Sequence, residues 1–254
     1  MEDIEKFVRG FSRFQEQYFS DPQTIYDTLR DGQHPTTLLI GCCDSRVDPM
    51  LLTGSDPGDM FVVRNIANLV PPCTPTAPPG VSSAIEFAVC NLQVARVIVL
   101  GHARCGGIRA LMSPSAPVAE TDFVGQWMRI AEPVARRVKH ELAHRSLEHQ
   151  HTACEQASIL QSLENLLTYP WVKRRVEQGS LKLHGWYFDM QSGALMAYSA
   201  RQERFLPLVC PIERKVGPPA RSPEHGGPAA AQQGAGSAGQ AGGCGAGASC
   251  TCTG

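Results

Sequence analysis

The sequence lacks an excess of either charge. Its 254 residues carry a formal net charge of -1 at pH 7, and the sequence pI is about 6.7. A strongly basic surface is what draws a protein to nucleic acid, and a strong acidic bias would also suggest a class of partner. Neither is present, so we expect no nucleic-acid partner.

Long apolar runs are also missing. No stretch approaches the roughly 18 apolar residues that a membrane-spanning helix needs. The chain starts with MEDIEKFVRGF, which has neither the basic start nor the apolar stretch of a secretion signal. These absences predict a soluble, cytoplasmic protein with no membrane partner.

Cysteine, by contrast, is abundant, with ten residues. In a small secreted chain this number would suggest disulfides, but in a chain of this size without an export signal it favours metal or thiol chemistry. Hydrophobic residues make up 43% of the sequence, which is enough to bury the core of one sizeable domain.

The hydrophobic pattern alternates between strands and helices. Short apolar runs predict buried strands over residues 36–42, 59–65 and 95–102. Helical spacing of apolar residues predicts helices over residues 2–19, 22–30, 81–92, 121–148 and 152–167. Residues 181–189 and 194–200 are typical of a hairpin. This alternation predicts an α/β fold with a mainly parallel β-sheet flanked by helices.

Composition divides the chain into three regions. Residues 1–35 are predicted to form an N-terminal helical arm, and residues 36–216 the α/β domain that carries the chemistry. Residues 217–254 consist mostly of Gly, Ala, Ser, Pro and Gln. Such a segment has too little apolar surface to offset the entropy lost on ordering, so we expect a disordered C-terminal tail.

Two motifs carry residues that are suited to metal chemistry, CCDSR at 42–46 and GHARCGG at 101–107. Thiolate and imidazole are preferred zinc ligands, and the spacing of His102 and Cys105 lets both reach one ion from the turn after a strand. Cys42 ends a neighbouring predicted strand, and ligands of such sheets bind beyond the carboxyl ends of the strands. We therefore expect three protein ligands and a fourth position open for water, as in a catalytic zinc site.

A His-x-x-Cys pair is a weak signal by itself, and cysteine is among the most commonly buried residues. The combination favours a metal site, because both segments follow predicted strands and both lie among small residues.

Asp44 and Arg46 follow Cys42 by two and four residues. A carboxylate and a guanidinium this close can pair bidentately, and an isolated pair of this kind is more often structural. Next to a metal-binding cysteine, two further roles are open to Asp44: it binds the zinc itself, or it accepts a hydrogen bond from water at the metal. Arg46 would decide between them by holding the carboxylate away from the ion.

These motifs resemble the β-class carbonic anhydrases. The similarity runs from about residue 4 to about residue 205, and Cys-x-Asp-x-Arg followed about sixty residues later by His-x-x-Cys-Gly-Gly is specific to that family. The segments that carry the resemblance are GCCDSRVDP (41–49), PGDMFVVRNIANLVPP (57–72), GVSSAIEFAVCNLQV (80–94), VIVLGHARCGGI (97–108) and LHGWYFD (183–189).

The resemblance implies an enzyme that hydrates CO2 reversibly to bicarbonate and a proton. It implies one Zn²⁺ per subunit on Cys42, His102 and Cys105, and a catalytic dyad of Asp44 and Arg46. It also implies a homodimer, formed through the N-terminal helices, or an assembly of such dimers. Two alternatives stay open: a hydrolase of a CO2 isostere such as carbonyl sulfide or carbon disulfide, and a non-catalytic protein that senses zinc or bicarbonate.

Two features depart from the family pattern. Position 43 is usually serine there and is Cys43 here, which we interpret as an inert small residue. Some members bind bicarbonate at a second site made of a tryptophan, an arginine and a tyrosine, and the aspartate then closes onto the zinc. The matching positions are Leu39, Arg64 and Phe188, so only the arginine is kept. We expect this switch to be absent and Asp44 to stay off the metal near neutral pH.

Overall fold

The computed structural model describes residues 2–21, 24–75, 79–113 and 122–211. The predicted C-terminal tail lies outside these residues, so its disorder and the boundary at residue 216 stay predictions. None of the described helices is both long enough and apolar enough to cross a membrane.

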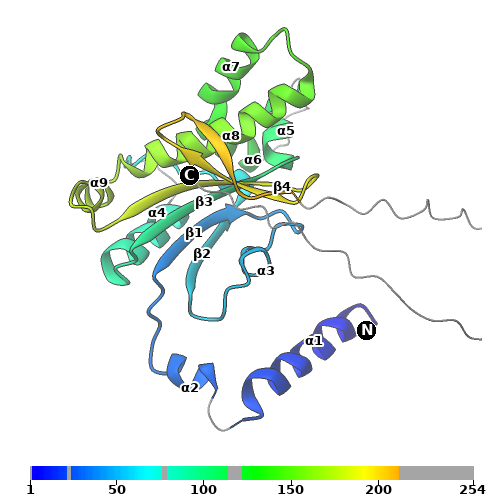
Figure 1. The fold of residues 1–254 in the computed structure, drawn as a ribbon, viewed down its shortest axis with the longest axis vertical. Coiled ribbons are helices and arrows are strands. Elements are labelled where there is room, and N and C mark those ends of the chain that lie inside the picture. Colours follow the sequence, from blue (N-terminus) through cyan, green and yellow to red (C-terminus); the bar gives the residue numbers. More distant parts are fainter. Residues whose placement is uncertain (1, 22–23, 76–78, 114–121, 212–254) are drawn as a thin grey trace, which may run out of the picture. The chain divides into compact units, whose positions relative to one another are not determined.

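A six-stranded sheet in the order β2-β1-β3-β4-β5-β6 forms the centre of the fold (Figure 1). The first four strands run parallel and the last two pair antiparallel, which confirms the mainly parallel α/β fold. The strands are β1 (Thr37–Cys42), β2 (Met60–Asn65), β3 (Arg96–His102), β4 (Lys182–Asp189), β5 (Ala194–Ser199) and β6 (Arg204–Val209).

The register of the central strands positions the metal-binding motifs. All of β1 is buried, and so is β3 after its first residue, as expected for strands covered on both faces. Gly41 lies opposite Leu100 in the parallel pairing of β1 and β3. Cys42, one residue after Gly41, and His102, two residues after Leu100, therefore emerge at the same carboxyl edge of the sheet.

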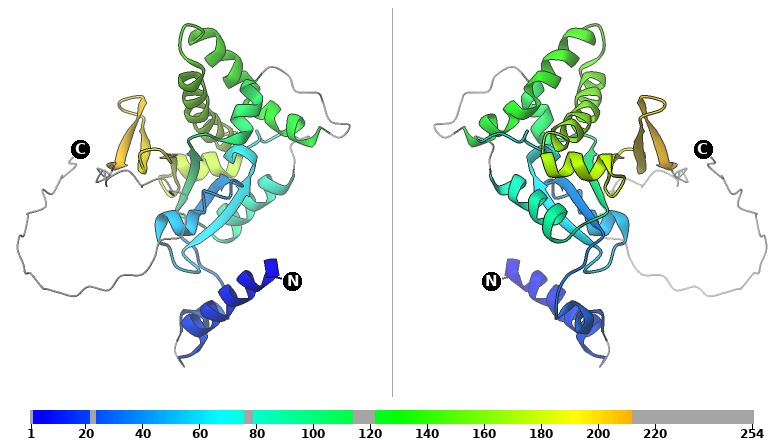
Figure 2. Two further views of the ribbon diagram at one scale, coloured as in Figure 1. Left: turned by 90° about the vertical axis from the view of Figure 1, so that its right-hand side faces the viewer. Right: turned by 90° about the vertical axis from the view of Figure 1, so that its left-hand side faces the viewer.

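Helix α8 packs against β3 and β4, and α7 lies beside α8 (Figure 2). The single helix expected over residues 121–148 is divided, because Pro133 starts α7 and the side chain of Ser146 caps α8 by accepting from the His149 amide. The helices of this region are α5 (Gly106–Met112), α6 (Phe123–Met128), the 3₁₀ turn η3 (Arg129–Ala131), α7 (Glu132–Glu141) and α8 (Leu147–Leu166).

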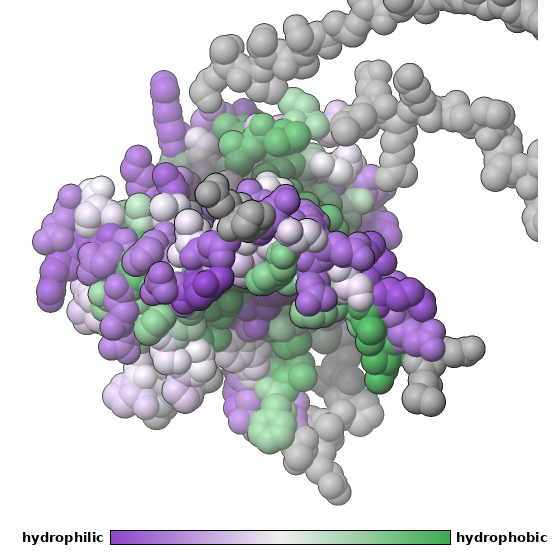
Figure 3. All heavy atoms as spheres, turned by 90° about the horizontal axis from the view of Figure 1, so that it is seen from below, coloured by the Kyte–Doolittle hydropathy of each residue, from purple (hydrophilic) through white to green (hydrophobic). Residues whose placement is uncertain are grey.

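The N-terminal helices are α1 (Glu2–Phe19) and α2 (Ile25–Leu29), close to the ranges that the sequence predicts. The ring of Phe14 in α1 contacts Tyr18 in a tilted arrangement and Tyr26 edge-on, with ring centroids 5.0 and 5.6 Å away. Other apolar residues of α1 are exposed: Ile4, Phe7, Val8 and Phe11. Figure 3, which views the molecule from below, shows hydrophobic side chains exposed among polar ones.

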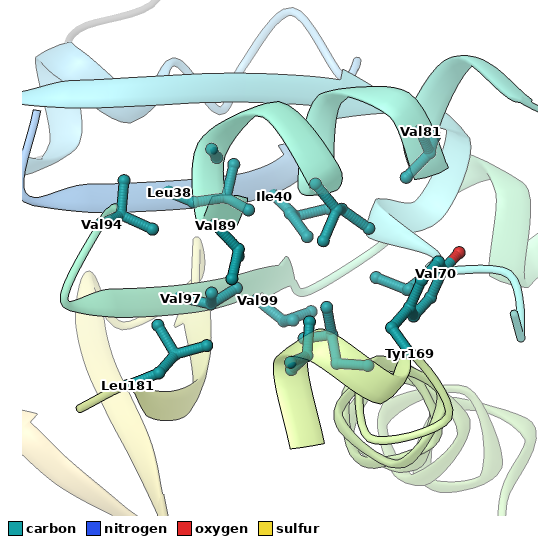
Figure 4. Close-up of a cluster of buried hydrophobic side chains, with 14 of the residues drawn as sticks. Leu38, Ile40, Val70, Val81, Val89, Val94, Val97, Val99, Tyr169 and Leu181 are labelled. Atoms are coloured by element: carbon teal, nitrogen blue, oxygen red, sulfur yellow. The ribbon is translucent and has the colours of Figure 1, made fainter. Parts of the chain in front are cut away.

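The largest core cluster lies on one face of β1 and β3 (Figure 4). Alternate strand residues share a face, so Leu38 and Ile40 lie beside Val97 and Val99. They pack against side chains from α4 (Pro79–Glu86), the π-helical turn η2 (Phe87–Asn91) and the residues around α9 (Pro170–Glu177), among them Val81, Val89, Tyr169 and Leu181.

A smaller cluster, of which Leu39, Ile98 and Leu100 are the buried strand residues, forms the core on the opposite face of these strands. Beside it lies the short helix α3 (Pro49–Thr53), which the sequence analysis did not predict because five residues show no helical period. Its local signals are nonetheless complete: Asp48 accepts from the Leu51 amide, Pro49 occupies the first turn, and Gly54 ends the helix at φ 62°.

Helix α9 and strand β6 were also not predicted. Strand β6 contains Pro207, which argues against a central strand and is tolerated here because β6 is the edge of the sheet.

Candidate metal centre

Cys42, His102 and Cys105 come together at the carboxyl edge of the sheet. Their ligand atoms all lie within 4.8 Å of one another, and all three residues are buried. Cys42 ends β1, His102 ends β3, and Cys105 is the N-cap of α5. Within the described ranges, no other set of three or more His, Cys, Asp or Glu side chains is close enough to hold one ion.

The imidazole of His102 is oriented for ligation. Its Nδ1 lies 2.9 Å from the Ala103 carbonyl oxygen, an acceptor that requires Nδ1 to carry the proton. Nε2 is then an acceptor, and it is buried with no hydrogen-bond partner among the residues that the structure describes. Leaving a buried polar atom unsatisfied costs about 1–3 kcal/mol, so this lone pair fits a site that a metal ion completes.

The two thiols compete for one negative charge. The hydrogen bond from Cys105 lowers the pKa of Cys42 to about 4. The same hydrogen bond, together with burial, raises the pKa of Cys105 far above its ordinary value. The first thiolate therefore forms readily and the second does not, unless a cation is present. A divalent cation resolves this conflict because it binds both sulfurs as thiolates, so the donor set fits zinc.

Asp44 and Arg46 form a bidentate pair beside the three ligands. Nε of Arg46 donates to Oδ1 of Asp44 at 2.9 Å, and Nη2 donates to Oδ2 at 2.7 Å. The Arg46 amide also donates to Oδ1, at 3.0 Å. The hydrogen bond from the Arg46 side chain holds the pKa of Asp44 well below its ordinary value, so the group is a carboxylate at neutral pH. Its Oδ2 lies 3.9 Å from Nε2 of His102, too far for a hydrogen bond.

The guanidinium of Arg46 also connects the two motifs. Its Nη2 donates to the carbonyl oxygen of Arg104 at 3.2 Å. Arg104 lies between His102 and Cys105 and adopts a left-handed conformation with φ 58°, which is uncommon for a residue other than glycine. The loop that carries two metal ligands is thus tied to the residue that orients Asp44.

Arg64 of β2 holds the backbone of the first motif. Its Nε donates to the Cys42 carbonyl at 2.9 Å, and its Nη2 donates to the carbonyls of Asp44 and Val47 at 2.8 and 3.1 Å. The other two positions that match the second bicarbonate site, Leu39 and Phe188, lie in the smaller apolar cluster. The hydrogen-bond donors of Arg64 are therefore used by backbone carbonyls of the first motif. Leu39 and Phe188 provide no aromatic polar group beside it.

The sequence analysis missed a buried carboxylate behind the metal loop. Oε1 of Glu155 accepts from the Cys105 amide at 3.0 Å, and Oε2 accepts from the Tyr187 hydroxyl at 2.8 Å. Glu155 is only 4% exposed, and this burial raises its pKa. A lone carboxylate in a predicted helix gives no motif, and the only signal was its place beside the inward-facing Ser158 and Ile159 of α8.

Two glycines of the second motif allow close packing. A Cβ on Gly101 would lie 2.7 Å from Cδ1 of Ile159, and a Cβ on Gly107 would lie 2.8 Å from Cγ2 of Ile66. Gly106, by contrast, has no atom within 4 Å of such a Cβ. Of the Gly106–Gly107 pair, only the second glycine is required by close contacts.

Comparison with known proteins agrees with this geometry. The sequence profile of the family described as Carbonic anhydrase matches residues 37–195, a range that includes both motifs. Beta carbonic anhydrase 5, chloroplastic, of Arabidopsis thaliana is 42% identical over 179 residues, which cover 70% of this chain and 59% of that protein's length. The chain thus spans less than two thirds of that relative. A carbonic anhydrase of Synechocystis sp. is 36% identical over 195 residues, covering 77% of this chain and 71% of the relative.

Solved structures show the same fold. The β-carbonic anhydrase CcaA superposes with a TM-score of 0.77 at 34% identity, covering 84% of this chain and 94% of that one. A structure from a study of two tetrameric β-carbonic anhydrases of Sordaria macrospora gives a TM-score of 0.63 at 27% identity, covering 82% and 94%. On its sequence, its fold and the matched range, the chain belongs to the β-class carbonic anhydrases.

Proposed function

We propose that this protein catalyses the reversible hydration of CO2 to bicarbonate and a proton, with one zinc ion per subunit held by Cys42, His102 and Cys105. The observation that carries the proposal is the meeting of three buried soft ligand atoms beside a carboxylate that is held by an arginine. When bound, zinc supplies the Lewis acidity that makes water a nucleophile near neutral pH.

Asp44 supplies a fixed acceptor next to this site. Because Arg46 holds both of its oxygens, the carboxylate does not turn freely toward the ligands. It is ionised at neutral pH, so it accepts a hydrogen bond from the reacting water and orients that water's lone pair toward CO2. Asp44 and Arg46 thus act as the catalytic dyad, and Asp44 stays off the metal.

The N-terminal arm supports a homodimer. On the described face of α1, Phe7 is 73% exposed and Phe11 is 63% exposed, which is unfavourable in water unless a partner covers them. A second copy of this chain is the partner we propose, and tetrameric relatives make an assembly of such dimers reasonable. We also propose a cytoplasmic location, although one relative is described as chloroplastic.

The test is a stopped-flow assay of CO2 hydration on the purified protein, before and after zinc removal. We expect about one zinc per subunit by elemental analysis, loss of activity on chelation, and recovery when zinc is returned. Cys42→Ser should lose both zinc and activity, whereas Cys73→Ser, at an exposed cysteine, should retain them. Activity that survives complete zinc removal would refute the proposal. Faster release of sulfide from carbonyl sulfide than hydration of CO2 would favour the isostere hydrolase instead.

A further inference from the structure

A cavity of about 460 Å³ adjoins the metal-binding loop. Ala103 and Arg104, which lie between the ligands His102 and Cys105, form part of its wall. The rest of the wall comes from α5, α8 and the β4–β5 hairpin, and most of the residues that form it have polar or charged side chains. The reaction proposed above uses none of the side chains that line this cavity.

Basic side chains from three different elements converge there: Arg104 from the loop, Arg109 from α5 and His151 from α8. Across the described ranges, neither guanidinium has a hydrogen-bond or ion-pair partner. Burial lowers the pKa of His151, and the positive charges of Arg109 and Lys139 lower it further. The positive charge of Arg109 thus acts on His151 within the wall of the cavity.

Two carboxylates, of Glu148 and Asp189, also line the cavity, and neither forms an ion pair with Arg109 among the described residues. The Asp189 carboxylate accepts from the Gln191 amide at 2.9 Å and from the Ser192 hydroxyl, so the turn that it closes already uses both of its oxygens. Asp189 also interacts electrostatically with Arg104. Glu148 is exposed and forms no ion pair with any described residue.

We propose that this cavity binds an organic phosphate, a phosphate monoester of a small polyol. The phosphate oxygens lie against Arg104, Arg109 and His151, since guanidinium groups bind phosphate through charge-assisted hydrogen bonds. The cavity is larger than a free oxyanion requires. The polyol hydroxyls occupy the remainder, where the amide of Gln156 and the carboxylate of Glu148 offer donors and acceptors.

Binding in this cavity can affect the metal centre through Arg104. This coupling rests on the proposed function. The Arg104 carbonyl accepts from Nη2 of Arg46, the same nitrogen that holds Oδ2 of Asp44. A phosphate that fixes the Arg104 side chain also restrains its left-handed backbone. Loop and dyad are then stabilised together, so an occupied cavity changes the rate of CO2 hydration through Asp44 rather than by blocking the metal.

The binding test uses the zinc-loaded full chain, with glycerol 3-phosphate as the probe and glycerol as the neutral control. Isothermal titration calorimetry at constant ionic strength should detect glycerol 3-phosphate and not glycerol. Arg109→Gln and His151→Gln should each weaken binding about tenfold or more, since a hydrogen bond to a charged group is worth about 1.5–3 kcal/mol. Arg137→Gln removes the same charge from an exposed site on α7 and should leave the affinity unchanged.

The site would be overturned if the wild type did not bind glycerol 3-phosphate. It would also be overturned if Arg109→Gln bound with the affinity of the wild type, because the anion would then lie at the metal instead. An equal loss of affinity in Arg137→Gln would indicate general charge attraction and would likewise overturn it. Circular dichroism and zinc content confirm that each variant is folded and loaded.

The coupling is tested separately in the stopped-flow assay. At a glycerol 3-phosphate concentration that just saturates the wild type, kcat should change for the wild type and change much less for Arg109→Gln, whose site is then mostly empty. Binding without any change in an active enzyme would refute the coupling and keep the site. An enzyme inactive toward CO2 with or without the probe would refute the proposed function, while the calorimetric result stands by itself.

Discussion

Arg46 donates two parallel hydrogen bonds to the Asp44 carboxylate, from Nε to Oδ1 at 2.9 Å and from Nη2 to Oδ2 at 2.7 Å. Only a planar fork of two donors makes this contact, and a lysine ammonium does not reproduce it. On the proposed function, this geometry keeps the carboxylate beside the thiols of Cys42 and Cys105 and the imidazole of His102 without making it a fourth ligand.

Arg46→Lys is therefore expected to lower kcat/KM for CO2 hydration by about 10- to 100-fold, because the charge is kept but the orientation of Asp44 is lost. Zinc content should not change, since Arg46 is not a ligand. Stopped-flow kinetics and elemental analysis check both points. Arg30→Lys, in the exposed pair of Arg30 with Asp27, is the matched control and should behave as the wild type. Wild-type kinetics in Arg46→Lys would show that the pair is only structural.

Bicarbonate is expected to inhibit the enzyme without cooperativity. Arg64 donates to three backbone carbonyls, and Leu39 and Phe188 offer no polar group to a second bicarbonate. Nothing in this arrangement drives Asp44 away from Arg46. Initial rates measured over a series of bicarbonate concentrations near neutral pH should fit simple inhibition. A sigmoidal loss of activity, or a zinc ion with Asp44 as its fourth ligand in a crystal grown near neutral pH, would contradict the expectation.

Tyr187→Phe is expected to destabilise the zinc-loaded protein by about 1–3 kcal/mol, because it leaves Oε2 of buried Glu155 without its hydroxyl donor. The effect should also weaken the restraint on Cys105, whose amide donates to the other oxygen of Glu155. Urea denaturation measures the change in the free energy of unfolding. Tyr198→Phe removes the hydroxyl of a half-buried tyrosine elsewhere in the sheet and serves as the control. Equal stability of the two variants would mean that water replaces the hydroxyl of Tyr187.

The sequence was sufficient to bring together the candidate ligands because the hydrophobic pattern predicts where strands end. Apolar runs placed Cys42 and His102 at the ends of neighbouring parallel strands, and the His-x-x-Cys spacing added Cys105. The pairing of Asp44 with Arg46 beside the site was predicted from their closeness to Cys42 along the chain. In each case the relevant contact is local or is fixed by parallel pairing, which the hydrophobic pattern encodes.

The contacts that hold the two motifs in place could not be predicted from the sequence because they join segments that are distant along the chain. Glu155 reaches Cys105 across fifty residues and Tyr187 across thirty-two. Arg64 was noticed only by resemblance, and its bonds to the loop carbonyls depend on the register of β2 against β1. The prediction of short elements failed for another reason. Helix α3 is defined by its caps and strand β6 by its position at the edge of the sheet, and neither feature produces a hydrophobic period in the sequence.

The pKa of His151 should rise toward 6.5, its ordinary value, when Arg109 is replaced by glutamine. In the wild type, burial and the charges of Arg109 and Lys139 lower this pKa. The native state therefore gives up the proton more easily than the unfolded chain, so His151 costs no stability well above pH 6.5 and opposes folding as the pH falls below it. NMR titration of the imidazole, assigned with His151→Gln, measures the shift. An unchanged pKa in Arg109→Gln would show that the charge of Arg109 does not act on His151 and that burial and Lys139 set its pKa.

Gly101→Ala tests how closely α8 approaches the strand that carries His102. The new Cβ would lie 2.7 Å from Cδ1 and 2.8 Å from Cγ1 of Ile159, closer than real contacts allow, and overpacking of this kind costs about 1–3 kcal/mol. Ile159→Ala alone should cost about 2–5 kcal/mol through the cavity that it leaves.

Because the two changes compensate, the double variant should be less destabilised than the sum of the single variants, which urea denaturation of all three can measure. Gly80→Ala, where a Cβ meets no atom within 4 Å, is the control. Additive effects in the double variant would mean that β3 or α8 shifts to accept the methyl group. His102 would then move as well, and the zinc affinity of Gly101→Ala should fall below that of Gly80→Ala.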